Sequence, residues 1–259
     1  MSVLSDTEYF YKSFGGDKGV AGYSEDGRPI YFVAVKKTAR PVILAQYAMH
    51  AREYVTAYLA ALMAEDFAKR GVHGTVYFLP AVNPDGIEIA ENVNPLYKAN
   101  GRGVDLNVNF DARWGTGAKN VKTPGAENYI GERPFSESES RALRDFTFKT
   151  NPDMTLSYHS KGEVIYWEFF QQGERRERDL KIAKKVSQVT GYPLGDAGIS
   201  AGGYKDWCVE KLHIPALTLE VGEDYLAHPI SPRQAGKIFE KHRNVLSAVT
   251  EMFFEGGGF

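Results

Sequence analysis

The stretch PVILAQYAMHARE, residues 41–53, decides the fold. Its first nine residues are apolar almost throughout, which is typical of a β-strand that is covered on both faces. His50 follows this strand, and Glu53 lies three residues further along the chain. Ligands bind beyond the carboxyl ends of the strands in open α/β sheets, so these two side chains can point at one place there. The pair suits Zn2+, although a core histidine before an acidic first helical turn has the same pattern.

Short apolar runs alternate with amphipathic stretches along the rest of the chain, which favours an α/β fold. Because α/β domains reach roughly 250 residues, we expect residues 1–259 to form a single domain. The expected strands cover residues 30–35, 41–47, 75–79, 154–158, 164–167 and 216–221. The expected helices cover residues 53–70, 137–149, 175–190, 205–212 and 232–254.

Local signals mark two helix starts and one long irregular segment. Ser136 and Glu139 have the spacing of a capping box, and Ser231 before Pro232 is typical of a helix start. Residues 80–132 are rich in Asn, Gly and Pro and show little periodicity. A segment of this length without regular structure inside a domain is usually functional.

The composition excludes several classes of protein. The 31 Lys and Arg residues against 33 Asp and Glu residues give a net charge of −2, which offers no basic surface for nucleic acid. No apolar run approaches the roughly 20 residues that span a bilayer, and the first residues lack the apolar core of a secretory signal. Cys208 is the only cysteine, so no internal disulfide can form. These features predict a cytoplasmic protein without a membrane span.

Two other polar residues close apolar strands, as His50 does. His159 follows the strand 154–158 and provides the third ligand that a catalytic zinc site needs when its fourth position stays open for water. Glu220 ends the last apolar strand, where a carboxylate is costly without a partner or a function. It is either salt-bridged or a general base beside a metal-bound water. We interpret the remaining histidines as structural or solvated: His73, His213, His228 and His242.

Five motifs occur in order along the chain: HARE at 50–53, NPDG at 83–86, GVDLNVNF at 103–110, SYHS at 157–160 and TLEVG at 218–222. Together they resemble the zinc carboxypeptidase family of carboxypeptidase A. The resemblance implies one domain with a mixed, mostly parallel twisted sheet flanked by helices. It also implies one Zn2+ per chain. His50, Glu53 and His159 would be its ligands, and Glu220 would be the general base.

The resemblance also gives roles to residues around this centre. Asp105 matches the acidic residue that holds the first zinc histidine. Arg52 matches an arginine of a substrate subsite, and Asn107 matches the asparagine that helps to bind the terminal carboxylate of the substrate. Lys98 and Arg102 are equally basic candidates for the residue that stabilises the oxyanion.

Three positions depart from the family pattern. Val108 stands where relatives carry the arginine that clamps the C-terminal carboxylate of the substrate, and valine cannot replace such a clamp. Lys205 occupies a position that lines the specificity pocket, where a cation favours a leaving group with an acidic side chain. The alternative is an exposed lysine in a first helical turn. The position of the usual active-site tyrosine is Gly198, so Tyr204 or another loop residue would have to substitute.

These departures point to one bacterial branch of the family. KANGRGVDLN at 98–107, HSKGEVIYW at 159–167 and GGYKDW at 202–207 are similar to γ-D-glutamyl-L-diamino acid endopeptidases. The similarity implies a zinc metallopeptidase that cuts peptidoglycan stem peptides between γ-D-Glu and meso-diaminopimelate or lysine. Its substrate would be a peptide or muropeptide, and no obligate protein partner is implied. Lys205 would read the side-chain carboxylate of diaminopimelate.

Three other functions stay open. One is a metallocarboxypeptidase that releases acidic C-terminal residues, with another cation in place of the missing clamp. The second is a deacylase of N-acyl amino acids. The third is a binding module without activity, which the presence of all three ligands and Glu220 disfavours.

Overall fold

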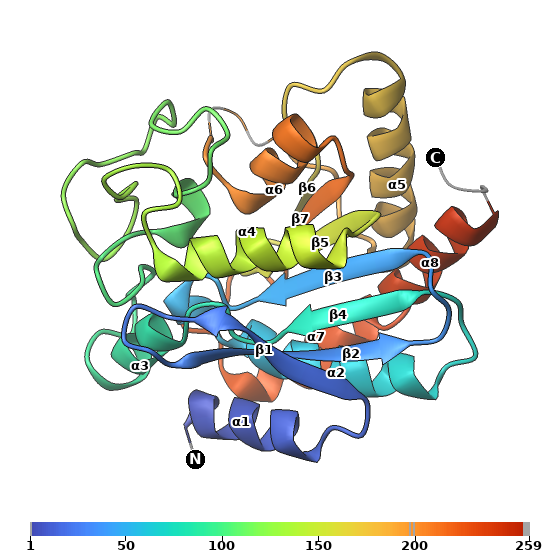
Figure 1. The fold of residues 1–259 in the computed structure, drawn as a ribbon, viewed down its shortest axis with the longest axis horizontal. Helices are drawn as coiled ribbons and strands as arrows, with labels where there is room; N and C mark the ends of the chain where they lie inside the picture. Colours follow the sequence, from blue (N-terminus) through green and yellow to red (C-terminus); the bar gives the residue numbers. More distant parts are fainter. Residues whose placement is uncertain (1, 197, 199, 256–259) are drawn as a thin grey trace.

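A seven-stranded sheet runs through the centre of the molecule, and helices cover both of its faces (Figure 1). The computed structural model describes residues 2–196, 198 and 200–255. Within these residues the strand order is β1-β2-β4-β3-β5-β7-β6. β3, β4, β5 and β7 are parallel to one another, β2 pairs antiparallel with both β4 and the edge strand β1, and the edge strand β6 pairs antiparallel with β7. The strands are β1 (Asp17–Tyr23), β2 (Pro29–Lys36), β3 (Val42–Tyr47), β4 (Thr75–Leu79), β5 (Met154–His159), β6 (Val164–Tyr166) and β7 (Ala216–Glu220).

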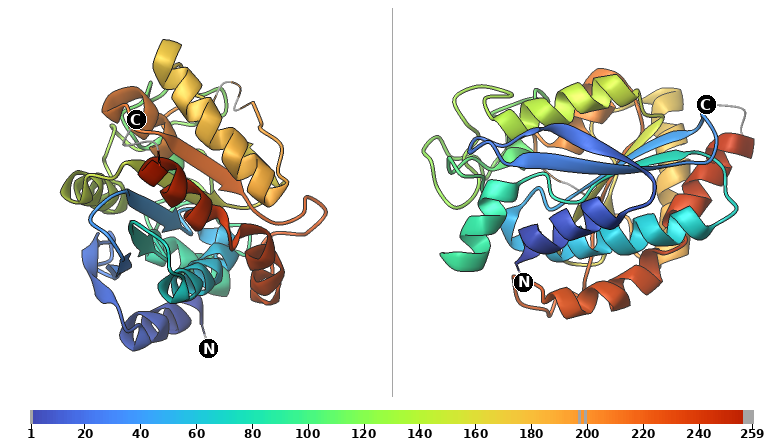
Figure 2. Two further views of the ribbon diagram at one scale, coloured as in Figure 1. Left: turned by 90° about the vertical axis from the view of Figure 1, so that its right-hand side faces the viewer. Right: turned by 60° about the horizontal axis from the view of Figure 1, so that its bottom comes forward.

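The helices form a layer on each face of the twisted sheet (Figure 2). α4 and α6 pack on one face, and α1, α2, α5, α7 and α8 pack on the other. The helices are α1 (Val3–Ser13), α2 (Val55–Lys69), α3 (Pro84–Asn92), α4 (Ser138–Thr150), α5 (Gly173–Thr190), α6 (Tyr204–Trp207), α7 (Ala235–His242) and α8 (Val245–Glu255). Shorter helical turns cover Ala51–Glu53, Leu106–Val108, Pro232–Gln234 and, as a π-helix, Cys208–Leu212. No helix in the described part of the chain is both long and apolar enough to cross a membrane.

The central strand β3 shows how the sequence builds this arrangement. Successive side chains of a strand point to opposite faces. Ile43, Ala45 and Tyr47 accordingly belong to the core under α2, whereas Leu44 belongs to the core under α4. Every residue of β3 is buried, as expected for a strand that is covered on both faces. The predicted α/β fold is confirmed, and each predicted strand is present to within one residue at each end.

The sequence pattern did not predict α1, β1, α3 or the helical turn Leu106–Val108. β1 is partly exposed and contains two glycines, so it lacks an apolar run. Gly22 of β1 lies directly beneath α4, and a Cβ at this position would be 2.4 Å from the Cβ of Ala142. Glycine is therefore needed where the helix and the strand approach each other.

Several predicted helix ends differ from the structure. The capping box is wrong because α4 begins after Glu137, and Ser136 donates from Oγ to the Glu137 carboxylate at 2.6 Å. The predicted helix 53–70 begins only at Val55, because residues 51–53 form a separate turn. The predicted start at Ser231 is confirmed by its Oγ, which accepts from the Arg233 amide at 3.4 Å. The single helix expected over 232–254 is divided into the turn Pro232–Gln234, α7 and α8.

Candidate functional site

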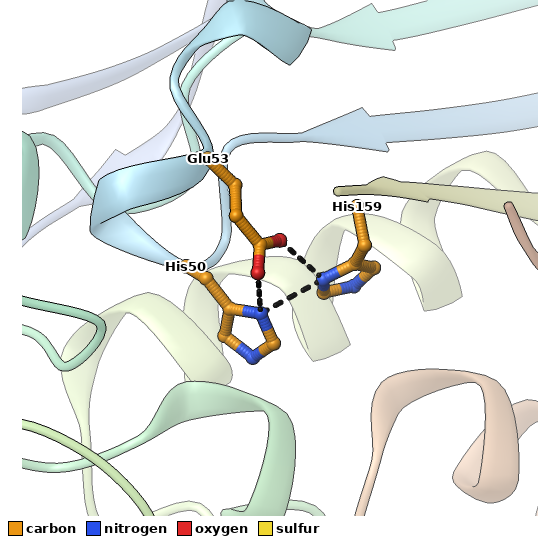
Figure 3. A group of neighbouring side chains, drawn as sticks. All are labelled: His50, Glu53 and His159. Atoms are coloured by element: carbon orange, nitrogen blue, oxygen red, sulfur yellow. Dashed lines mark hydrogen bonds and ion pairs between the residues drawn. The ribbon is translucent and has the colours of Figure 1, made fainter. Parts of the chain in front are cut away.

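Three side chains from two neighbouring strand ends point toward one another, as Figure 3 shows. His50 follows β3, Glu53 lies in the helical turn after it, and His159 is the last residue of β5. The Nδ1 atom of His50 lies 2.9 Å from Oε1 of Glu53 and 3.0 Å from Nδ1 of His159. Nδ1 of His159 lies 3.0 Å from Oε2 of Glu53. The parallel pairing of β3 with β5 therefore brings two imidazoles and a carboxylate to one point.

This donor set fits a zinc ion. The two Nδ1 atoms face each other at 3.0 Å, and both rings are almost completely buried. Two neutral imidazole nitrogens that present lone pairs to one point need a cation or a shared proton between them. Two imidazole nitrogens and one carboxylate oxygen are ligands that Zn2+ prefers, and three protein ligands leave a fourth position open.

A second group of potential ligands lies elsewhere in the described part of the chain, formed by Glu25, Glu137 and Glu139. It contains no imidazole. Burial raises the pKa of Glu139 to about 7, and Asn100 donates to this side chain and to Glu137. The histidine-containing group is therefore the better match to a catalytic zinc site.

Asp105 holds the first histidine in position. Its Oδ1 lies 3.2 Å from Nε2 of His50, and its Oδ2 lies 2.8 Å from Nζ of Lys98. Burial alone would raise the pKa of Asp105, but the charges of Lys98 and His50 outweigh burial and hold it well below its usual range. A carboxylate at Nε2 favours the tautomer that carries its proton there and leaves Nδ1 free to bind a metal.

The pKa values of Glu53 and Glu220 are shifted in opposite directions. Burial would raise the pKa of Glu53, but His50 and His159 outweigh it, so the pKa is lowered and the group stays charged. Glu220 pairs in register with His159 across β5 and β7. Burial, together with the negative charge of Glu53, raises the pKa of Glu220 to about 7. No described residue forms an ion pair or a hydrogen bond with the Glu220 carboxylate, which lines the cavity beside the ligands.

A cavity of about 510 Å³ opens beside this cluster. This volume is typical of a small-molecule site. Predicted site residues that line it are His50, Lys98, Asn107, Lys205 and Glu220, and Val108 and Gly198 line it as well. Lys205 is buried and donates to the Glu168 carbonyl at 3.0 Å, so it is not an exposed lysine of a helical turn. Asn107 accepts from the Tyr204 amide at 3.1 Å, which fixes its amide group.

The predicted site residues Arg102 and Tyr204 do not line the cavity. Arg102 is half-exposed and approaches Glu25 and Glu137 at 3.7 and 3.9 Å. Tyr204 is fully buried, and its hydroxyl lies 2.8 Å from Oγ1 of Thr147. The structure thus separates Arg102 from Lys98, and it directs the Tyr204 ring into the core.

Arg52 lies close to the ligands in sequence, but its contacts are with loop segments. Its guanidinium donates to the Leu96 carbonyl at 3.2 Å and lies 3.4 Å from the Glu127 carboxylate. Both partners belong to the irregular segment 80–132. Arg52 does not line the cavity.

Sequence reasoning did not identify one cation of the cavity, Lys119. It belongs to a loop that contributes Gly117, Ala118, Lys119 and Asn120 to the cavity wall. Within the loop Asn120 donates from its backbone amide to the Gly117 carbonyl at 3.1 Å, and the next residue, Val121, donates to the Asn128 carbonyl at 2.9 Å. No sequence motif marks Lys119.

The chain matches the family model described as zinc carboxypeptidase over residues 18–235. It is 31% identical over 218 residues to gamma-D-glutamyl-L-diamino acid endopeptidase 1 of Lysinibacillus sphaericus, covering 70% of this chain and 54% of that protein. It is 28% identical to a zinc carboxypeptidase of Simulium vittatum, covering 78% of this chain and 77% of that protein. The chain thus spans about half the length of the Lysinibacillus relative.

Solved structures share the fold. Bovine thrombin-activatable fibrinolysis inhibitor, in complex with a tick carboxypeptidase inhibitor, has a TM-score of 0.87 at 19% identity and covers 99% of this chain and 98% of its own. The murein-tripeptide amidase of Escherichia coli O157 has a TM-score of 0.67 at 22% identity, covering 92% of this chain and 95% of its own. At these identities the likeness concerns the architecture of the sheet and its helices.

Proposed function

Because the chain belongs to the zinc carboxypeptidase family, we propose that it cleaves the bond between γ-D-glutamate and a diamino acid in peptidoglycan stem peptides. It is a zinc metallopeptidase by family membership. Val108 on the cavity wall is the observation that carries the substrate proposal. The isopropyl side chain of valine has no hydrogen-bond donor for a carboxylate. At this position the chain therefore lacks the residue that would bind the C-terminal carboxylate of an ordinary carboxypeptidase substrate. The name of the Lysinibacillus relative supports the same substrate.

His50, Glu53 and His159 would hold the zinc ion, which polarises the scissile carbonyl and acidifies a water molecule when bound. Asp105 fixes the His50 ring so that Nδ1 faces the other ligands. Lys98 uses one of its three N–H donors on Asp105 and keeps the others for a substrate oxygen. It stabilises the negative charge that develops on the carbonyl oxygen, an effect worth about 3–4 kcal/mol per donor in hydrolases.

Glu220 acts as the general base and then as the acid. Its carboxylate accepts a proton from the attacking water and passes this proton to the leaving amide nitrogen. One carboxyl group performs both transfers because it accepts the proton while it is charged and delivers the proton while it is neutral. Because no described residue competes for the carboxylate, it is free to face water and substrate.

The test is a product analysis with the zinc-loaded chain. L-Ala-γ-D-Glu-meso-diaminopimelate, a peptide ending in glutamate and an N-acetyl amino acid are incubated separately, and the products are identified by mass spectrometry. We expect release of diaminopimelate from the first substrate, and no release by the Glu220→Gln variant.

Each other outcome contradicts the proposal. Cleavage of the glutamate-ended peptide alone identifies a carboxypeptidase for acidic residues, the function that Lys205 also fits. Cleavage of the N-acetyl amino acid alone identifies a deacylase. A zinc-loaded protein that cleaves none of the three is a binding module.

A further inference from the structure

The side chain of Asn83, the first residue of the NPDG motif, links two backbone segments that carry site residues. Asn83 is fully buried and does not line the cavity. Its Nδ2 atom donates to the Met49 carbonyl and to the Ala99 carbonyl, both at 3.0 Å. Met49 directly precedes His50, and Ala99 directly follows Lys98. One amide group therefore connects the start of the ligand turn to the segment that carries Lys98.

The two segments also meet directly, where the Ala51 amide donates to the Lys98 carbonyl at 3.0 Å. A single hydrogen bond fixes a distance but leaves the two segments free to turn about it. The two contacts of Asn83 lie on either side of this bond, so together the three bonds fix the orientation as well. Both carbonyl acceptors belong to buried residues, where an unpaired carbonyl is costly.

The other residues of the motif hold the Asn83 side chain in place. Oδ1 of Asn83 accepts from the Gly86 amide at 2.9 Å, which caps the start of α3 and orients Nδ2. A Cβ at Gly86 would lie 2.2 Å from the Ala99 carbonyl oxygen and 2.5 Å from Nδ2 of Asn83, so only glycine permits this close approach. Asp85 accepts from Arg28 at 2.7 Å, which ties the start of α3 to the turn before β2.

We infer that Asn83 is a positioning residue, which fixes Lys98 relative to His50 by holding the backbone next to each of them. This inference rests on the proposed function, in which Lys98 stabilises the negative charge on the substrate oxygen and His50 binds zinc. A displacement of about 1 Å at a catalytic group can lower a rate by about 100-fold. A hydrogen bond between backbone segments can therefore control the reaction without contact between Asn83 and the substrate.

The experiment is a double-mutant cycle between Asn83 and Lys98 in the zinc-loaded chain, on whichever substrate the wild type hydrolyses. Asn83→Ser keeps an oxygen that can cap α3 and removes both N–H donors. We expect it to lower kcat by about 10- to 100-fold with little change in KM, because the charge that Lys98 stabilises develops only in the transition state. In the Lys98→Met background the same substitution should lower kcat less than about threefold, because the group that Asn83 positions is absent.

Asn109 offers a matched control. It is equally buried and does not line the cavity, and its Nδ2 atom donates to the Ile130 and Arg133 carbonyls at 2.9 and 3.1 Å. Asn109→Ser removes the same kind of contact from a different loop, so any effect on kcat should be the same factor with Lys98 and with Lys98→Met. Urea unfolding of the two serine variants shows whether they lose comparable stability.

Zinc affinity, measured by competition with a chelator, tests the link to the ligand turn and needs no substrate. Asn83→Ser should raise the Kd for zinc about 10-fold, the lower end of the range for loss of a group that orients a metal ligand. Asn109→Ser should change this Kd less than threefold.

The outcomes separate this inference from the proposed function. If no γ-D-Glu bond is cut, the proposed function fails, and the inference is decided on another hydrolysed substrate or, without one, by the zinc affinities. If Asn83→Ser lowers kcat by the same factor with and without Lys98, the two residues act independently and the inference is overturned. Equal zinc affinities of Asn83→Ser and the wild type would overturn it as well.

Discussion

Glu220 and His50 lie in one cavity, yet their proposed contributions to the reaction can be separated. In the proposed site His50 would supply a ligand nitrogen, whereas Glu220 lies beside the candidate ligands and pairs in register with His159. Glu220→Gln should keep one zinc per chain and lower kcat by about 10²- to 10⁴-fold, the range for loss of a general acid–base group. His50→Ala should lose both zinc and activity. Metal analysis of the purified variants beside their kcat values tests both expectations.

The opposite pattern would reject the assignment. If Glu220→Gln lost its zinc, the carboxylate would belong among the ligands. If His50→Ala kept zinc and full activity, the candidate metal centre would lie elsewhere.

The choice between Lys98 and Arg102 also belongs to the residue scale. Lys98 lines the cavity and contacts Asp105, whereas Arg102 turns toward Glu25 and Glu137. Lys98→Met should lower kcat by about 10²- to 10³-fold, as loss of an oxyanion donor does. Arg102→Met should change kcat less than about threefold, since exposed ion pairs of this kind contribute little. Steady-state kinetics with parallel zinc analysis would expose a reversed order, which would move the oxyanion role to Arg102.

At the scale of elements, the loop that carries Lys119 completes the cavity wall. No described residue forms an ion pair or a hydrogen bond with Lys119, so its charge is available to an anionic substrate. Lys119→Ala should raise KM for a γ-D-glutamyl substrate by about three- to tenfold with little change in kcat, because an exposed cation adds modest binding energy. Lys122→Ala, an exposed position outside the wall, should leave KM unchanged. Equal effects of the two substitutions would mean that only the overall charge of the loop matters.

The strands could be predicted because each depends on local sequence, and the candidate zinc ligands could be predicted because each lies at or just after a strand end, within a motif of the family. β3 is an apolar run, His50 follows within three residues of its end, and His159 is the last residue of the neighbouring strand β5. β1 could not be predicted, because it is partly exposed and Gly22 is explained only by its contact with Ala142. The direction of the Tyr204 side chain was equally inaccessible, since it depends on Thr147 in a helix 57 positions earlier in the chain.

At the scale of the whole molecule, one buried histidine lies where the sheet meets its helices. His242 ends α7 and is fully buried between the rings of Tyr158 in β5 and Tyr192, at ring-centre distances of 5.6 and 5.0 Å. Neither of its ring nitrogens has a hydrogen-bond partner among the described residues. Burial, with a smaller contribution from Lys241, lowers the pKa of His242 to about 3.

This lowered pKa predicts that the protein loses stability in acid. Below an ordinary histidine pKa of about 6.5, the unfolded chain binds a proton at His242 and the folded chain does not. The free energy of unfolding therefore decreases as the pH is lowered from about 6.5 to about 3. At pH 4.5 the difference of two pH units corresponds to about 3 kcal/mol. His242→Phe keeps an aromatic ring between the two tyrosines and removes this proton site, so its free energy of unfolding should fall less than that of the wild type between pH 7 and pH 4.5. Urea unfolding of both proteins at several pH values measures the difference, and parallel curves would show that His242 does not carry it.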